Sequence, residues 1–314
     1  MNLQQLEYIV AVERYKHFVT AAEKCFVTQA TLSMMIKKLE DELGVKIFDR
    51  AKQPVVPTVI GEKIIEQAKV VLREVARIKE IVKEETAQVK GELKIGIIPT
   101  LAPYLLPLFL KSFLAKYPEV KLQLSELTTS EIIERIKHSS LDAGILAIPL
   151  SDPDLIEQPL FSEEFVIYFS EKHAQSPKMH FSPADLDVSQ LWLLDEGHCM
   201  RNQVINLCGL KLEERSRHRL DLSASSIETL KKVVDINEGI TVLPYLALRD
   251  LTKAQLRRVR YFKPPVPVRK IGLVSFRYFV KEKMLDALKA EILSALPPEM
   301  LSEKNKKVIE ISLE

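Results

Sequence analysis

Apolar residues near the start of the chain recur at the spacing of helices. The first run predicts an amphipathic helix, with apolar positions at Leu3, Leu6, Ile9 and Val10. A second predicted helix begins after a Thr28 cap and ends at Gly44, and its apolar positions are Leu32, Ile36, Leu39 and Leu43. In both helices these spacings place the apolar residues on one face.

The segments around the second of these helices complete a recognisable pattern. Thr20 followed by Glu23 is a capping box, which predicts a short helix from Ala21 to about Cys25. Residues 45–50 and 55–58 have β character and predict a two-stranded wing. This is a winged helix-turn-helix pattern.

One long helix is predicted between Val59 and Lys90, closed by Gly91. Its apolar residues alternate four and three apart, as in a coiled-coil seam, at Ile64, Ala68, Val71, Val75, Ile78 and Val82. The seam can pack on a neighbouring domain or on a second copy of the chain. We favour self-association, because two-fold DNA readers need a dimer seam.

From Glu92 onward, predicted strands alternate with predicted helices. Strands at 93–98, 120–126 and 143–148 are separated by helices at 101–116 and 130–138. This alternation predicts a largely parallel sheet with helices on both faces. Further strands are expected at 165–169, 191–194, 239–243 and 270–275. Further helices are expected at 200–207, 226–237 and 281–296.

These patterns divide the chain into four parts. They are a winged helix-turn-helix domain at 1–58, a linker helix for dimerisation at 59–91, an effector domain at 92–297, and a tail at 298–314. The lysine-rich tail is expected to be weakly ordered.

The composition limits the class of protein but does not indicate a binding partner. The chain has 314 residues, of which 46% are hydrophobic and 28% charged, and its net charge is +2. Its start has no signal-peptide pattern, and no apolar run approaches the length of a membrane span. We therefore expect a cytoplasmic protein that does not act at a membrane. A DNA-binding surface would depend on where charges lie rather than on an excess of them.

The three cysteines raise a question of redox chemistry. Cys199 and Cys208 lie nine positions apart, beside His198. If a helix joins them, their Cα atoms lie roughly 13 Å apart. A disulfide needs about 7 Å or less, so the two could bridge only if the helix between them were remodelled. The alternative is that both are simply small buried residues. Cys25, beside the predicted turn, is expected to serve packing.

Two groups of residues resemble the signatures of LysR-type transcriptional regulators. The N-terminal group comprises residues 21–23 and 27–33, Ile36, residues 39–40 and residues 43–50, and a later one covers Gly239 to Pro244. The resemblance implies an α/β fold with an N-terminal winged helix-turn-helix, a long linker helix and a two-lobed effector domain built like periplasmic binding proteins. Lobe I would comprise about 92–163 and 268–297, and lobe II about 164–267. Ala30 stands where many relatives have proline.

Within that family, residues 197–203 together with Cys208 resemble the signature of the hydrogen-peroxide sensors. The resemblance implies that Cys199 is the peroxidatic cysteine and Cys208 the resolving one. It also places four further residues at the site, namely His198, Thr100, Thr129 and Arg269. Asn202 departs from the aspartate that many relatives carry.

These residues also suggest how the site would work. Peroxide reacts with a thiolate, so we expect the helix start after Cys199, with His198 and Arg269, to lower the pKa of this thiol. Thr100 and Thr129 would hold the peroxide oxygens. The alternatives are that both threonines only cap helices and that His198 only orients its neighbours.

The predicted recognition helix and wing supply candidate DNA contacts. The helix offers Thr28, Gln29, Thr31, Ser33, Met34 and Lys37. The wing offers Lys46, Arg50 and Lys52.

The expected partners are double-stranded promoter DNA, hydrogen peroxide, further copies of the chain in a homodimer or homotetramer, RNA polymerase and a cellular disulfide reductant. No cofactor or metal is expected. One alternative function is a regulator that senses a metabolite between the lobes. Another is a thiol peroxidase, which the helix-turn-helix and the lack of a C-x-x-C motif disfavour, so we expect no enzyme.

Overall fold

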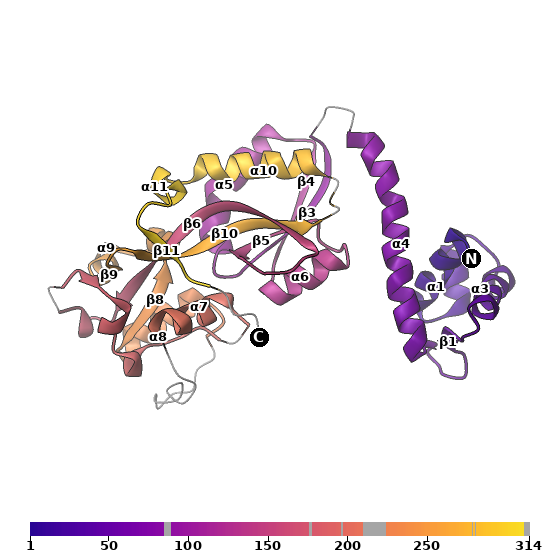
Figure 1. The fold of residues 1–314 in the computed structure, drawn as a ribbon, viewed down its shortest axis with the longest axis horizontal. Helices are drawn as coiled ribbons and strands as arrows, with labels where there is room; N and C mark the ends of the chain where they lie inside the picture. Colours follow the sequence, from indigo (N-terminus) through magenta and orange to yellow (C-terminus); the bar gives the residue numbers. More distant parts are fainter. Residues whose placement is uncertain are drawn as a thin grey trace. The chain divides into compact units, whose positions relative to one another are not determined.

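The computed structural model divides the chain into two compact units, Met1–Ala87 and Gln88–Glu314, which are described separately (Figure 1). It describes residues 1–84, 89–175, 178–195, 197–209, 224–277, 279 and 281–310. None of the described helices is long and apolar enough to cross a membrane.

The first unit packs short helices around a small core. Its helices are α1 (Leu3–Tyr15), α2 (Phe18–Lys24) and α3 (Gln29–Leu43), followed by α4 (Val59–Glu84). The wing is the antiparallel pair β1 (Phe48–Asp49) and β2 (Val56–Pro57), as predicted. The fully buried apolar residues include Ile9, Val12, Leu32, Ile36 and Leu39. Helical spacing thus located most of the core, although Leu3 and Leu43, at the ends of the two predicted faces, are exposed.

The start of α2 differs from the prediction. The helix begins at Phe18, and the N-cap is His17 rather than Thr20. The backbone N–H of Thr20 donates to His17 Nδ1 over 3.4 Å, so an imidazole nitrogen takes the place of the expected hydroxyl. Capping by histidine is uncommon, and the Thr-x-x-Glu pattern pointed three residues too far along the chain.

The predicted seam of α4 is shared between two environments. Ala68, from the seam, and Ile65, one residue off it, are buried in the core of the first unit, where α4 packs on α1. Val71 and Ile78 are 36% and 64% exposed. The first half of the helix therefore helps to complete the winged unit, whereas the seam residues Val71 and Ile78 stay exposed, as do Val59 and Ile60 at the helix start.

The second unit is built on a mixed sheet. Its strands are β3 (Gly91–Ile97), β4 (Val120–Glu126), β5 (Ala143–Ile148), β6 (Leu155–Phe169), β7 (His180–Phe181), β8 (Ile240–Pro244), β9 (Val259–Phe262), β10 (Val266–Phe276) and β11 (Lys306–Val308). Along the main path the order is β4-β3-β5-β10-β6-β9-β7, with β11 beside β10 and β8 beside β6.

The expectation of a largely parallel sheet is wrong. Strand β3 runs parallel to β4 and β5, but β10 is antiparallel to both β5 and β6. Strand β6 pairs with β10 up to Glu164 and with β8 from Phe165. Only the second part of β6 was predicted, because Pro159 and neighbouring glutamates interrupt the apolar pattern of the first. One strand, β6, therefore pairs with β10 along its first part and with β8 and β9 along its second part.

Helices cover both faces of this sheet, as predicted. They are α5 (Ala102–Lys116), α6 (Thr129–Lys137), α7 (Cys199–Cys208), α8 (Ile227–Asn237), α9 (Lys253–Leu256), α10 (Glu282–Ala295) and α11 (Pro298–Leu301). Figure 1 shows α5 and α10 side by side above the strands and α6 below them. The expected strand at 191–194 is reduced to isolated bridges, Leu191 with Ile240 and Leu194 with Ala224.

The tail is ordered where it is described, against expectation. Helix α11 is followed by β11, which pairs in parallel with the start of β10. Met300 and Ile309 are buried, with 4% and 7% of their surface exposed. The sequence did not indicate this strand because two of its three residues are lysines. Only alternate residues of a short edge strand need to be apolar.

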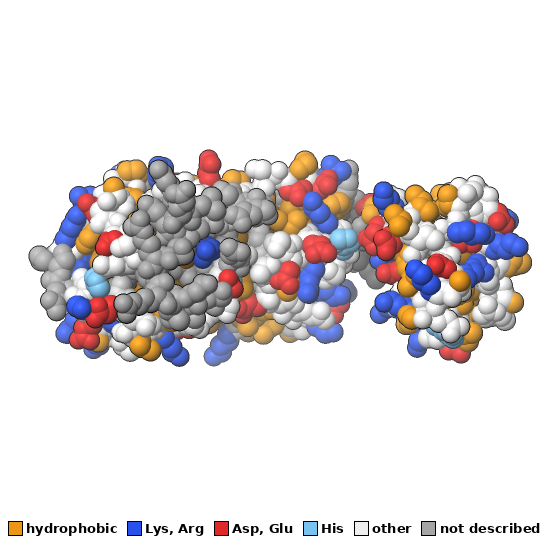
Figure 2. All heavy atoms as spheres, turned by 90° about the horizontal axis from the view of Figure 1, so that it is seen from below, with side chains coloured by type: hydrophobic (Ala, Val, Ile, Leu, Met, Phe, Trp, Pro, Cys, Tyr) orange, Lys and Arg blue, Asp and Glu red, His pale blue; other side chains and the backbone are white. Residues whose placement is uncertain are grey.

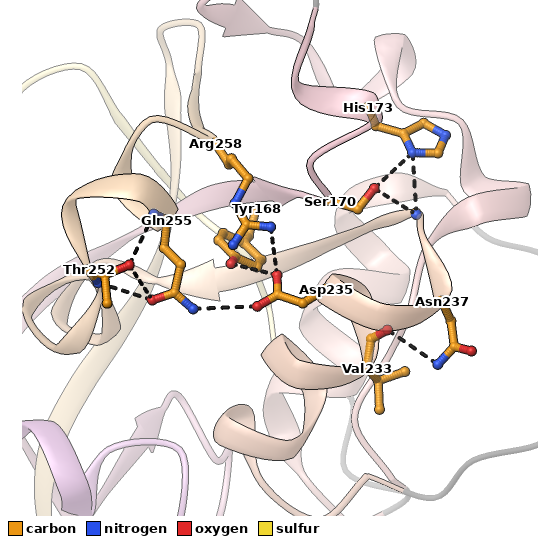
Figure 3. Close-up of polar contacts among 10 residues, drawn as sticks. Tyr168, Ser170, His173, Val233, Asp235, Asn237, Thr252, Gln255 and Arg258 are labelled. Carbon is orange, nitrogen blue, oxygen red and sulfur yellow. Dashed lines mark hydrogen bonds and ion pairs between the residues drawn. The ribbon is translucent and has the colours of Figure 1, made fainter.

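A polar cluster joins α8 to β6 and to the segment around α9 (Figure 3). Asp235 accepts from the Tyr168 hydroxyl and from Arg258 Nη1, both over 2.8 Å. Burial and the Asp235 carboxylate raise the pKa of Tyr168, so this hydroxyl stays protonated as a donor. The cluster fixes the end of α8 on the sheet.

Surface charge is mixed. On the face shown in Figure 2, the Lys and Arg side chains are interspersed with Asp and Glu over the described residues. This agrees with a net charge of +2 in a chain that has 45 basic and 43 acidic residues.

Candidate functional site

Cys199 is the first residue of α7, and its side chain is buried, with 7% of the residue exposed. Its sulfur is hydrogen-bonded to the hydroxyl of Thr129, the first residue of α6. The two helix starts therefore face each other across the thiol. His198 is the N-cap residue of α7 and is partly exposed.

A small cavity lies beside this thiol. Its volume is about 10 Å³, the room that one water molecule needs. It is lined by Ile98, Pro99, Thr100, Thr128, Thr129, Gly197, His198 and Cys199. The structure thus brings Thr100, Thr129 and His198 around Cys199, as the sequence suggested. The threonines are not helix caps, because Thr128 caps α6 and Leu101 is the N-cap of α5.

Arg269 reaches the site through Thr100 rather than through the sulfur. Its Nη1 donates to the Thr100 hydroxyl over 2.7 Å, and its Nη2 donates to the Thr100 carbonyl over 3.1 Å. Its Nε donates over 2.8 Å to Glu163 Oε2. Both charged residues are fully buried, so they must neutralise each other. Arg269 therefore fixes the position of Thr100.

Glu163 is a site residue that the sequence did not reveal. It lies on β6, and its second oxygen accepts from the backbone N–H of Leu246 over 2.9 Å. Its partner Arg269 is 106 residues away on β10, directly opposite it in the ladder. The one feature that could have indicated its role is that Glu163 is a carboxylate within a largely buried strand.

Electrostatics at Cys199 differ from the expectation. Burial raises the pKa of this thiol above its ordinary value. The Thr129 hydrogen bond, the backbone N–H at the helix start and the positive charge of Arg269 oppose this increase. Burial also lowers the pKa of His198, so the neutral imidazole contributes polarity and not charge. The resting site therefore favours the thiol.

Cys208 lies at the opposite end of α7. Burial raises the pKa of its thiol to about 12. Both cysteines are free, and the helix that joins them has ten residues. The expected separation of roughly 13 Å between their Cα atoms follows from the helical rise. The structure is thus the dithiol form, and a bridge would require α7 to lose its helix.

The candidate DNA contacts lie on α3 and the wing. Thr28 caps α3 by accepting from the N–H of Thr31 over 3.2 Å. Ser33 is partly buried and accepts from Arg50 Nη1 over 3.1 Å. The remaining candidates have exposed side chains, namely Gln29, Thr31, Met34, Lys37, Lys46, Arg50 and Lys52. A hydrogen bond therefore joins Arg50 in the wing to Ser33 on the helix face.

The sequence did not reveal the role of Glu40. This residue is 2% exposed, and its Oε1 accepts from the backbone N–H of Ile47 over 2.8 Å. Its Oε2 lies 3.5 Å from Lys46 Nζ and 3.6 Å from Arg50 Nη2. A buried carboxylate on α3 thus anchors the wing and places two of the expected phosphate contacts.

Comparison with known proteins identifies the family. Residues 86–290 match the LysR substrate binding domain, and residues 3–62 match the bacterial regulatory helix-turn-helix of the lysR family. The chain belongs to the LysR family of transcriptional regulators. Its α/β fold is the two-lobed LysR architecture that the sequence predicted.

Several relatives of this LysR-family chain are described as peroxide regulators. The hydrogen peroxide-inducible genes activator of Haemophilus influenzae is 37% identical over 276 residues, which cover 87% of this chain and 90% of the relative. A full-length OxyR from Pseudomonas aeruginosa, with a cysteine replaced by aspartate, has a TM-score of 0.72 and 34% identity, covering 93% of this chain and 98% of that one.

A third relative is a peroxide-bound cysteine-to-serine variant of OxyR from Corynebacterium glutamicum. It has a TM-score of 0.60 and 27% identity, and the match covers 94% of this LysR-family chain and 92% of that one.

Proposed function

We propose that this LysR-family protein is a DNA-binding transcriptional regulator that senses hydrogen peroxide by reversible formation of a Cys199–Cys208 disulfide. The supporting observation is the cavity of about 10 Å³ between Cys199 and the two threonines, which suits a molecule the size of peroxide. The space lies directly beside the buried thiol that would react.

In the first step Cys199 reduces one peroxide molecule. The thiol proton is lost, the sulfur bonds to one peroxide oxygen, and the O–O bond breaks. The departing oxygen takes up a proton and leaves as water. Sulfur is oxidised by two electrons to a sulfenic acid, and peroxide is reduced by two.

The surrounding residues assist this step in different ways. Thr129 hydrogen-bonds the sulfur and opposes the effect of burial on its pKa. Thr100, oriented by Arg269, presents its hydroxyl oxygen as an acceptor for a peroxide O–H. Neutral His198 lines the cavity and adds polarity beside the thiol. These groups position the reactants and stabilise charge that develops on the leaving oxygen.

In the second step the Cys208 sulfur attacks the Cys199 sulfur. A sulfur–sulfur bond forms, the Cys208 proton is lost, and the sulfenic hydroxyl leaves as water after protonation. Because α7 holds the two cysteines apart, this step requires the helix to unwind. The remodelled segment would change how effector domains associate and hence which DNA spacing the paired winged units bind.

The remaining roles follow from the family. Paired winged units in a homodimer or homotetramer would bind double-stranded promoter DNA and act on RNA polymerase in the cytoplasm. A cellular disulfide reductant would restore the thiols. No cofactor is needed, because peroxide supplies the oxidising equivalents, and the protein would consume one peroxide per cycle rather than act as an enzyme.

The test is a peroxide pulse of one equivalent followed by mass mapping under non-reducing conditions. We expect a Cys199–Cys208 linkage, and none in the Cys199→Ser variant. Oxidation of Cys199 directly to sulfinic acid would contradict the disulfide. A retained transcriptional response in Cys199→Ser would favour a metabolite sensor, and turnover of many peroxide equivalents would favour a peroxidase.

A further inference from the structure

The segment Lys306–Glu310, here called the strap, lies along the side of β10. Its strand part pairs with Val266 to Val268, and the N–H of Ile309 donates to the Val268 carbonyl over 2.9 Å. Lys306 Nζ donates to the Glu299 carbonyl over 2.8 Å. The strap is therefore fixed to the sheet by bonds that do not involve α7.

Two side chains of α7 are bonded to this strap. Gln203 Nε2 donates to the Ile309 carbonyl over 3.0 Å, and Asn206 Nδ2 donates to the Glu310 carbonyl over 3.4 Å. Gln203 is fully buried. Both lie between the two cysteines in the sequence, so the backbone that carries them must move when the cysteines are joined.

Helical spacing links these bonds to the thiol. Cys199, Gln203 and Asn206 are four and three residues apart, so they lie on one face of α7. The Oε1 atom of Gln203 has no hydrogen-bond partner in the described part of the chain. The bond to Ile309 is thus the polar contact that holds this amide in place.

We propose that Gln203, held by the Ile309 carbonyl of the strap, is a positioning residue that keeps α7 helical in the dithiol form and so opposes disulfide formation. The inference rests on the proposed function. A bond made only in the dithiol form stabilises that form relative to the disulfide. The strap therefore raises the reduction potential of the cysteine pair.

The test compares Gln203→Met with the unaltered protein in glutathione redox buffers. Methionine keeps the volume and removes the donor. We expect the dithiol–disulfide equilibrium to shift about tenfold toward the disulfide, which lowers the reduction potential by about 30 mV for a two-electron couple. The matched control is Asn237→Ala, which removes a similar amide-to-carbonyl bond, to Val233 on α8 (Figure 3), and should leave the potential unchanged.

Urea unfolding of both redox forms separates positioning from a general loss of stability. Gln203→Met should lower the unfolding midpoint of the dithiol form and leave that of the disulfide form unchanged. Equal changes in both forms, or an unchanged potential, would overturn the inference. Asn206→Leu, which removes the other bond from α7 to the strap, should shift the potential in the same direction and serves if Gln203→Met does not fold. Absence of any disulfide in the unaltered protein would instead overturn the proposed function.

Discussion

The Nη1 atom of Arg269 lies 2.7 Å from the hydroxyl oxygen of Thr100, and both residues are buried. The guanidinium donates to that oxygen, so the hydroxyl proton and the remaining lone pair of Thr100 are free to orient toward the cavity. The position of Thr100 thus depends on Arg269, and the position of Arg269 depends in turn on its bond to Glu163.

Replacing Glu163 should destabilise the protein. Glu163→Gln keeps the shape of the side chain but leaves the buried Arg269 guanidinium without a counter-charge, so we expect the free energy of unfolding to fall by about 3 kcal/mol. Urea denaturation measures this. Lys172→Gln, which removes an exposed ion pair with Glu238, is the control and should have little effect. Equal effects would contradict the assigned burial of the charge.

Removing the Thr129 hydroxyl should slow oxidation of Cys199. In Thr129→Val the thiolate loses a hydrogen bond, so the thiol pKa rises further and sulfenic acid forms roughly tenfold more slowly near neutral pH. Because only the thiolate reacts, the rate rises with pH, and this profile should move to higher pH in the variant. Stopped-flow peroxide kinetics give both results. Thr241→Val, at a buried threonine bonded to Trp192, is the control.

Gln29→Ala should reduce sequence preference more than general DNA affinity. An amide on the exposed start of α3 can bind an adenine edge, and losing such a contact costs about 1–3 kcal/mol on cognate DNA only. Binding to cognate and random duplexes at matched salt measures the ratio. Lys37→Gln should instead weaken both equally and reduce the salt dependence. Equal losses for Gln29→Ala would exclude base contact.

Glu40→Gln should loosen the wing. The amide still accepts from Ile47, but the attraction to Lys46 and Arg50 is lost. We expect about twofold weaker binding to any duplex, since these side chains contribute to phosphate contacts and one screened pair is worth about 0.5 kcal/mol. Fluorescence anisotropy measures this, with Glu42→Gln as a control. Unchanged affinity would show that the wing does not need this anchor.

Sequence patterns predicted the features that depend on residues close together in the chain, such as helices and strands. Periodicity gave α3 and the alternation of strands and helices, and the cysteine segment gave the two ends of α7. Glu163 and Glu40 were missed, because each acts through a partner brought close only by the fold. The strap was missed for the same reason: its bonds to Gln203 and to β10 join residues far apart in the chain.

The cavity beside Cys199 also has a consequence for selectivity. It has room for about one water-sized molecule beside the buried thiol, and Thr100 and Thr129 in its lining are buried as well. Bulkier alkyl hydroperoxides carry the same reactive O–O bond but would have to keep the alkyl group outside this space. Discrimination among oxidants would then work as a molecular sieve, in which size decides what reaches the thiol before reactivity matters.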